Sequence, residues 1–138
     1  MYSVFLGALS TQTHISCETR GGITENVFSV TLGVDLARLS VIDDEVEPGT
    51  VHLLRLAPLA WLSQTEETRF ENIATEFGPV TLKWKLLDGG KTLQVTYAPS
   101  FRRKPDAEVL HVPPLDGIRA VIVNGQERQV GAGDRIKL

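Results

Sequence analysis

The sequence predicts a mainly β protein: an antiparallel β-sandwich of jelly-roll or Greek-key type, with room for one helix in the first 50 residues. Apolar and polar residues alternate along several segments of the second half, as in strands with one buried face. Turn residues separate these segments at intervals of about ten residues, which is typical of sandwiches and barrels. The composition, 42% hydrophobic and 22% charged, is that of a chain that buries a core.

The clearest predicted element is a β-hairpin over residues 80–97. Its first strand alternates four apolar residues with polar ones: Val80, Leu82, Trp84 and Leu86. The sequence Asp-Gly-Gly-Lys at 88–91 then tolerates the positive φ angles of a tight turn, and a second alternating segment follows at 93–97. Trp84 lies on the apolar side of its strand, so we expect it in the core.

Further strands are predicted at 51–56, 108–112, 118–123, 126–130 and 135–138. Pro113-Pro114 should end the second of these, because proline cannot donate a ladder hydrogen bond. Asn124-Gly125 is the strongest turn signal in the chain. The segment 118–123 has apolar residues on both sides and is expected in the middle of a sheet.

Two periodicities compete between Val27 and Val46. Apolar residues alternate as in a strand from Phe28 to Leu36, and we interpret the segment as a strand on this pattern. Phe28, Leu32, Leu36 and Leu39 also share one helical face, with Asn26 available as an N-cap. A helix is therefore the alternative.

Charge and hydropathy exclude several classes of function. The net charge is −3, and the one basic run, Arg102-Arg103-Lys104, is too short to follow a phosphate backbone. We expect no nucleic-acid partner. No segment approaches the roughly 20 apolar residues that span a bilayer, so no membrane partner is expected. The first residues lack the basic start of a signal peptide.

No catalytic residue is predicted. The sequence has no G-x-S-x-G motif, and Cys17, with His14 three residues before it, is interpreted as a small core residue. His52 and His111 lie in strand-like segments and are expected on a polar face or hydrogen-bonded in the core. A carboxylate within hydrogen-bond reach of either histidine, in a pocket, would instead favour a small enzyme.

No metal or cofactor is predicted either. The acidic run Asp43-Asp44-Glu45 with Glu47 lacks the spacing of a calcium loop, and we interpret it as a solvated turn. Glu66, Glu67, Glu71 and Glu76 are assigned to a connecting region on the surface. Both assignments leave the acidic residues without a chemical role.

Three residues are candidates for ligand binding. Trp61 and Tyr97 are aromatic residues that could form a flat platform for a sugar ring, and Trp61 follows Pro58 in a loop-like stretch. Arg20 begins the loop Arg20-Gly21-Gly22, and loops of this kind often carry binding residues.

The second half also resembles a known family. The segments 75–84, 93–95, 110–113 and 121–125, which read TEFGPVTLKW, LQV, LHVP and VIVNG, are similar to the C-terminal β-sandwich of α-L-rhamnosidase-like glycoside hydrolases. The similarity covers residues 50–138. In these enzymes the sandwich follows an (α/α) barrel that holds the catalytic carboxylates, and this chain is too short to include such a barrel.

The resemblance implies a non-catalytic accessory domain that stabilises or covers the catalytic domain of a glycoside hydrolase. Residues 1–138 then form one β-rich domain, with residues 1–49 as the tail of a preceding domain and a helix favoured from Asn26 to Val46. An exposed apolar patch, built from the first fifty residues, should cause self-association. The alternative is a stand-alone carbohydrate-binding module whose partner is an oligosaccharide.

Overall fold

The computed structural model describes residues 27–138, with side chains described from Gly33 onward. The chain divides into two compact units at Leu39 and Ser40. Helix α2 (Val27–Val41) begins in the first unit and ends in the second. The second unit holds the strands β1 (Ile42–Asp43), β2 (Thr50–Leu53), β3 (Thr68–Ile73), β4 (Val80–Leu87), β5 (Thr92–Pro99), β6 (Ala107–His111), β7 (Ala120–Val123), β8 (Gln126–Gln129) and β9 (Arg135–Lys137), with a short helix α3 (Leu59–Leu62).

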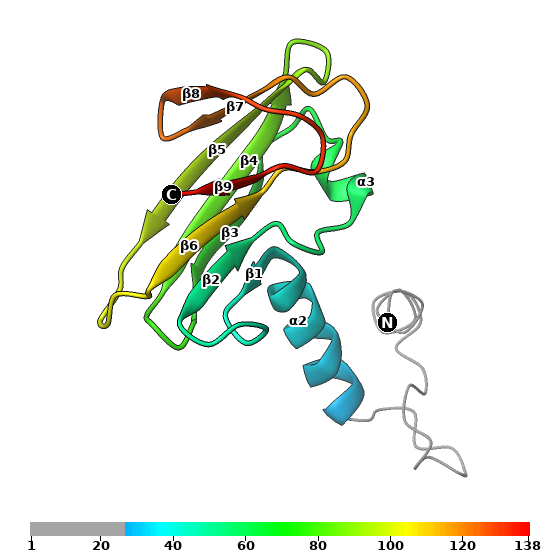
Figure 1. The fold of residues 1–138 in the computed structure, drawn as a ribbon. Coiled ribbons are helices and arrows are strands. Elements are labelled where there is room, and N and C mark those ends of the chain that lie inside the picture. The colour runs from blue at the N-terminus through cyan, green and yellow to red at the C-terminus, as the bar shows by residue number, and fades with distance from the viewer. Residues whose placement is uncertain (1–26) are drawn as a thin grey trace, which may run out of the picture. The chain divides into compact units, whose positions relative to one another are not determined.

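The strands form two sheets that face each other (Figure 1). One has four strands in the order β1-β2-β6-β9, and the other has five in the order β3-β4-β5-β7-β8. The predicted mainly β, sandwich-like fold with one early helix is confirmed. Most neighbouring strands are antiparallel, but β2 pairs with β6 and β5 with β7 in parallel. These parallel pairs arise because the chain crosses to the other sheet between their two strands.

The hairpin of β4 and β5 is confirmed and forms the middle of the five-stranded sheet. The two strands pair from Val80 opposite Pro99 to Leu87 opposite Thr92. Asp88 and the two glycines after it take positive φ angles in the turn, as the sequence predicted. Alternate residues of β4 are buried. The apolar residues that recur at every second position of the sequence are therefore those on the inner face of this sheet.

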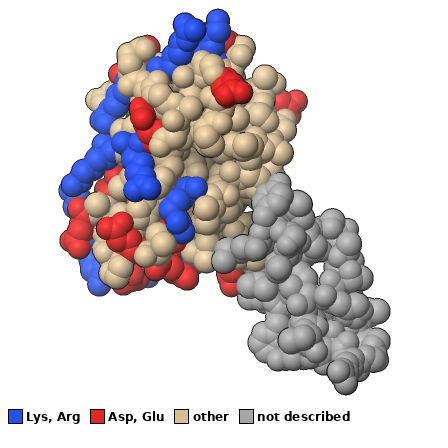
Figure 2. Space-filling view, turned by 45° about the vertical axis from the view of Figure 1, so that its right-hand side comes forward, with Lys and Arg blue, Asp and Glu red and all other residues tan. Residues whose placement is uncertain are grey.

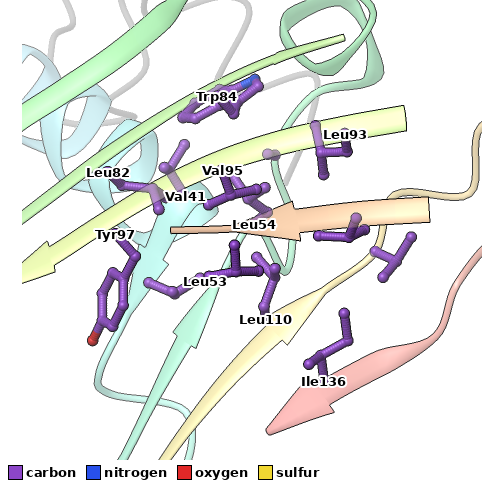
Figure 3. Close-up of a cluster of buried hydrophobic side chains, with 14 of the residues drawn as sticks. Val41, Leu53, Leu54, Leu82, Trp84, Leu93, Val95, Tyr97, Leu110 and Ile136 are labelled. Carbon is purple, nitrogen blue, oxygen red and sulfur yellow. The ribbon is translucent and has the colours of Figure 1, made fainter. Parts of the chain in front are cut away.

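The core lies between the sheets. Figure 3 shows Trp84, Leu82, Leu93 and Val95 of the five-stranded sheet on one side of the cluster. Side chains of the four-stranded sheet, including Leu53, Leu110 and Ile136, lie on the other side (Figure 3). Trp84 is almost fully buried, as expected, and its indole Nε1–H donates to the Trp61 carbonyl at 3.2 Å.

The Asn124-Gly125 turn has a second structural role. Both residues have positive φ angles, as a two-residue hairpin turn requires. The Asn124 side chain then continues the ladder of the sheet: its Oδ1 accepts from the Tyr97 backbone N–H, and its Nδ2 donates to the Tyr97 carbonyl, both at 2.8 Å. One side chain thus satisfies both backbone groups of a neighbouring strand.

The strand interpretation of residues 28–36 is wrong, because these residues belong to helix α2. A strand must find hydrogen-bond partners on a neighbouring strand, whereas a helix satisfies its backbone internally. The apolar residues of this segment also recur at helical spacing, and that pattern decides the structure. Asn26, the expected N-cap, lies outside the described residues.

Two further elements were not predicted. The supposed connecting region contains β3, an edge strand that pairs with β4 and has an irregular register between Phe70 and Ile73. This irregularity and the exposed Arg69 and Glu71 obscure the alternation in the sequence. Trp61, assigned to a loop, instead lies in α3.

Candidate functional site

A group of polar and charged side chains lies on the outer face of the four-stranded sheet. In β2 and β6, the residues beside the buried Val51, Leu53 and Leu110 point away from the core. Asp43 lies opposite His52 in the strand register, and Arg135 lies opposite His111. We call this group the outer-face cluster; it consists of Asp43, Glu47, His52, Arg55, His111 and Arg135.

Asp43 organises one end of the outer-face cluster. It is only 4% exposed, and its Oδ1 accepts the backbone N–H groups of Glu45 and Val46 at 3.1 Å. Its Oδ2 accepts from Arg55 Nε at 3.0 Å and lies 2.9 Å from Arg55 Nη2. Burial acts to raise the pKa of Asp43, but these hydrogen bonds and the Arg55 charge outweigh it and lower the pKa below its usual value.

Glu47, His52 and His111 form a chain of hydrogen bonds. The Glu47 carboxylate lies 3.1 Å from His52 Nε2, and His52 Nδ1 lies 3.0 Å from His111 Nε2. Because an ionised carboxylate only accepts, His52 Nε2 carries the proton that faces Glu47. In a neutral His52 ring Nδ1 is then an acceptor, and His111 Nε2–H donates to it.

The geometry of the histidine pair is that of a hydrogen bond rather than a metal chelate. The ring centroids are 5.2 Å apart, whereas the two facing nitrogens are 3.0 Å apart. The difference is close to twice the distance from the centre of an imidazole ring to its atoms. The two nitrogens therefore point at each other, whereas two ligands of one ion would both point at a third position. Among residues 27–138 no group of three or more His, Cys, Asp or Glu side chains is placed to hold a metal ion.

The two histidines differ in their electrostatic surroundings. His52 is 7% exposed and contacts the Glu47 carboxylate. Burial lowers the pKa of His111 to about 4, and the nearby His52, Arg135 and Arg55 charges contribute further. His111 is therefore neutral at physiological pH and acts as the donor described above.

The acidic run before β2 is solvated only in part: Glu45 and Glu47 are exposed, as predicted, but Asp43 and Asp44 are buried. Asp44 Oδ2 accepts the backbone N–H of Glu76 at 2.6 Å. The Asp44 carboxylate thus satisfies a backbone group of a loop that the sequence does not show to be a neighbour. A turn at Glu47-Pro48-Gly49 leads into β2, with Thr50 N–H donating to the Glu47 carbonyl at 3.1 Å.

The predicted ligand-binding residues are not brought together. Tyr97 is buried between the sheets (Figure 3), so its ring cannot serve as a solvent-facing platform. Burial together with the nearby Glu108 carboxylate raises the pKa of its hydroxyl. Arg20 lies outside the described residues.

Trp61 is half-buried at the edge of the sandwich. Its ring centroid lies 6.1 Å from that of Phe70, which in turn stacks on Trp84 at 5.7 Å. The three rings run from the partly exposed Trp61 to the buried Trp84. Sequence reasoning missed Phe70, and its signal was weak because Phe70 is the one aromatic residue in a polar stretch.

Apolar side chains are also exposed close to Trp61. Leu56 and Leu59, on either side of the buried Ala57-Pro58, are 53% and 48% exposed. Helix α3 lies at the right of Figure 1, the side that comes forward in Figure 2. Much of the surface to the right of centre in Figure 2 carries few charged residues. We call residues 56–61 the apolar segment.

Comparison with known proteins gives no relative: no family model, no curated protein and no solved structure matches the chain. No helix among the described residues is long and apolar enough to cross a membrane. Among the residues that carry the resemblance, Trp84 is a core residue, Asn124-Gly125 forms a turn and His111 belongs to the outer-face cluster. The functional assignment therefore depends on the geometry of the sandwich and of the helix before it.

Proposed function

We propose that this chain is a non-catalytic accessory β-sandwich that packs against the catalytic domain of a carbohydrate-active enzyme of the glycoside hydrolase class. The similarity of residues 50–138 to accessory sandwiches of such enzymes supports the carbohydrate context. Helix α2 supports the accessory role, because in the similar enzymes the sandwich follows a helical domain in the chain. Helix α2 runs into the sandwich unit at Ser40 and Val41.

The observation that carries the proposal is the distribution of apolar residues around α2. At 3.6 residues per turn, one side of the described part of the helix holds Val34, Ala37 and Val41, and another holds Leu36 and Leu39. Polar or small residues separate the two sides. An amphipathic surface helix has one apolar stripe, whereas a helix with two is expected to be covered on both sides.

The exposure of individual residues agrees with a missing neighbour. Val41 is fully buried, but Val34, two turns earlier on the same side of α2, is 64% exposed. Leu56 and Leu59 of the apolar segment are similarly exposed. Among the described residues the large exposed hydrophobics are these three and Val46. Val34 and Val46 lie within the first fifty residues, where the exposed apolar patch was expected, whereas Leu56 and Leu59 follow them. Leu56 and Leu59 lie in one short segment, and an exposed apolar patch favours a partner interface.

Sedimentation velocity of the full chain over a wide range of concentration tests this proposal. We expect reversible self-association of the wild type, because its apolar surfaces can cover one another when the partner is absent. The double variant Leu56→Ser/Leu59→Ser should shift the association to higher concentration. A matched control, Gln126→Ser/Gln129→Ser on the exposed strand β8, should leave it unchanged. A wild type that stays monomeric throughout would contradict the proposal.

One observation favours the alternative of a carbohydrate-binding module. Trp61 and Phe70 are both partly exposed and lie side by side, and aromatic rings at a surface can stack on the apolar face of a sugar. Trp61→Ala would then abolish oligosaccharide binding. The matched control is Phe101→Ala, which removes another partly buried aromatic residue, one that contacts Phe77.

A further inference from the structure

The outer-face cluster has a feature that the accessory role does not require: two histidines bonded directly to each other across two strands. His52 belongs to β2 and His111 to β6, and these strands pair in parallel. Two neutral rings can share one N–H···N hydrogen bond in either direction, depending on the tautomer. The number of protons on the pair therefore decides whether this contact exists.

The charged groups around the pair are arranged asymmetrically. Glu47, in the loop before β2, bonds to His52, and Asp43 on β1 lies opposite His52 with its charge paired to Arg55. On the other side, β9 places Arg135 opposite His111 and Lys137 opposite Val109, on the same face of the sheet. The two carboxylates, with Arg55 paired to Asp43, lie on the His52 side of the pair, and Arg135 and Lys137 lie on the His111 side. A positive charge is therefore disfavoured on the His111 ring.

The first proton leaves the contact intact. A protonated His52 still donates Nε2–H to Glu47, and its Nδ1–H now donates to His111 Nε2. His111 moves its own proton to Nδ1 and becomes the acceptor. The hydrogen bond reverses its direction, but the contact between the two nitrogens is kept.

A second proton cannot be accommodated in the same way. His111 would then carry N–H on both nitrogens, and two N–H groups would face each other across the contact. Two positive rings would also lie side by side, with Arg135 behind them. The result is repulsion between β2 and β6 in place of attraction.

We propose that the His52–His111 pair is a pH-sensitive lock on the outer face of the four-stranded sheet, closed with no proton or one proton added and opened by the second. Opening releases His111 from β2 and weakens the attachment of β6 and β9 to the sheet. The lowered pKa of His111 agrees with a second proton that binds only in acid. The proposal is independent of the accessory function, because it concerns the outer face alone.

Two-bond ¹H–¹⁵N NMR of the histidine rings in the full chain tests the lock, since it reports the protonation and the tautomer of each ring. The background variant His14→Gln removes the signals of the third histidine. We expect the pair to take up protons in two separate steps, with a change of the His111 tautomer in the first step. The second step should fall near pH 4.

The variant His52→Gln distinguishes coupling from simple burial. Removing the His52 charge should raise the midpoint of His111 by about one pH unit or more, whereas burial alone would leave it in place. An unchanged His111 midpoint would overturn the proposal.

If His52→Gln does not fold, Glu47→Gln, at the exposed end of the hydrogen-bond chain, serves instead, with Glu127→Gln on β8 as its control. Glu47→Gln removes the carboxylate that holds the proton on His52 Nε2, so it should change the tautomer of His111, and an unchanged His111 tautomer would equally overturn the lock.

Discussion

The two sheets of the sandwich are built on different principles. In the five-stranded sheet, β4 alternates between buried apolar residues and partly exposed polar ones along its whole length. In the four-stranded sheet, all four residues of β2 are buried, including Thr50 and His52. The first sheet is held by one apolar face, whereas the second also depends on a buried polar network on its outer face. Substitutions on the two outer faces should therefore have different effects.

The largest expected effect concerns the apolar face. Trp84→Ala removes a fully buried indole from the middle of the five-stranded sheet and leaves a cavity against Phe70 and the opposite sheet. We expect the free energy of unfolding to fall by about 3–5 kcal/mol, measured by urea denaturation. A loss well below this range would mean that the core collapses around the missing ring, or that the sheet does not depend on it.

A smaller but still substantial effect is expected at the outer-face cluster. Asp43→Ala leaves the partly buried Arg55 without its carboxylate and removes the acceptor of two backbone N–H groups. We expect a loss of about 2–3 kcal/mol at pH 7.

The ion pair of Asp43 and Arg55 also makes the free energy of unfolding depend on pH. The folded-state pKa of Asp43 is lowered, so its stabilisation is fully present above the ordinary value of 3.8 and is lost as the pH falls through the folded value. The stability difference between the wild type and Asp43→Ala should accordingly shrink in acid below that value. A difference that stays constant there would show that the carboxylate charge is not responsible.

His111 affects stability in a different pH range. Its folded-state pKa of about 4 is below the ordinary 6.5, so the unfolded chain binds the proton more readily. The stabilisation is complete above pH 6.5 and is lost as the pH falls from there to about 4. In urea denaturation, His111→Gln should lose less stability than the wild type over this range. Equal losses in the two proteins would contradict the assignment.

Asn124→Ala should have an intermediate effect in the five-stranded sheet. It removes the two hydrogen bonds to the Tyr97 backbone and replaces asparagine with a residue type that tolerates the positive φ angle of the turn less well. We expect a loss of about 1–3 kcal/mol in thermal or urea unfolding. Asn124→Gly keeps the turn conformation but not the hydrogen bonds, so it separates the two contributions.

The smallest effect is expected for an ion pair on the outer face of the five-stranded sheet. Lys83 on β4 lies 2.6 Å from Glu71 on β3, but the Glu71 side chain is exposed and that of Lys83 is partly exposed. Such pairs contribute little, because water competes for both charges. Lys83→Ala should be indistinguishable from the wild type in urea denaturation, and a clear loss would remove the contrast between the two sheets.

The difference between the two sheets also explains which parts of the structure could be predicted from the sequence. The hairpin of β4 and β5, the core position of Trp84 and the Asn124-Gly125 turn follow from local patterns, and the structure confirms them. The outer-face cluster joins residues from β1, β2, β6 and β9, and the parallel pairing of β2 with β6 cannot be inferred from alternation. His52 and His111 were expected on a polar face or hydrogen-bonded in the core. Their contact with each other depends on this pairing and was not predicted.

Other errors have local causes. Residues 27–41 carry both an alternating and a helical pattern, and the choice depends on whether a neighbouring strand is available. Strand β3 has a register irregularity and lies at a sheet edge, where polar residues are tolerated on both sides. Asp44 could not be placed, because its partner is a backbone N–H far along the chain.

Tryptophan fluorescence, titrated with a panel of plant and bacterial oligosaccharides, tests the proposed accessory function most directly. Wild type, Trp61→Ala and Phe101→Ala are compared, and Trp84 remains as a reporter in each. If the chain is an accessory domain whose aromatic residues close the sandwich, none of the three should show a saturable change. Saturable binding by the wild type and Phe101→Ala, lost in Trp61→Ala, would contradict this account and establish a carbohydrate-binding module.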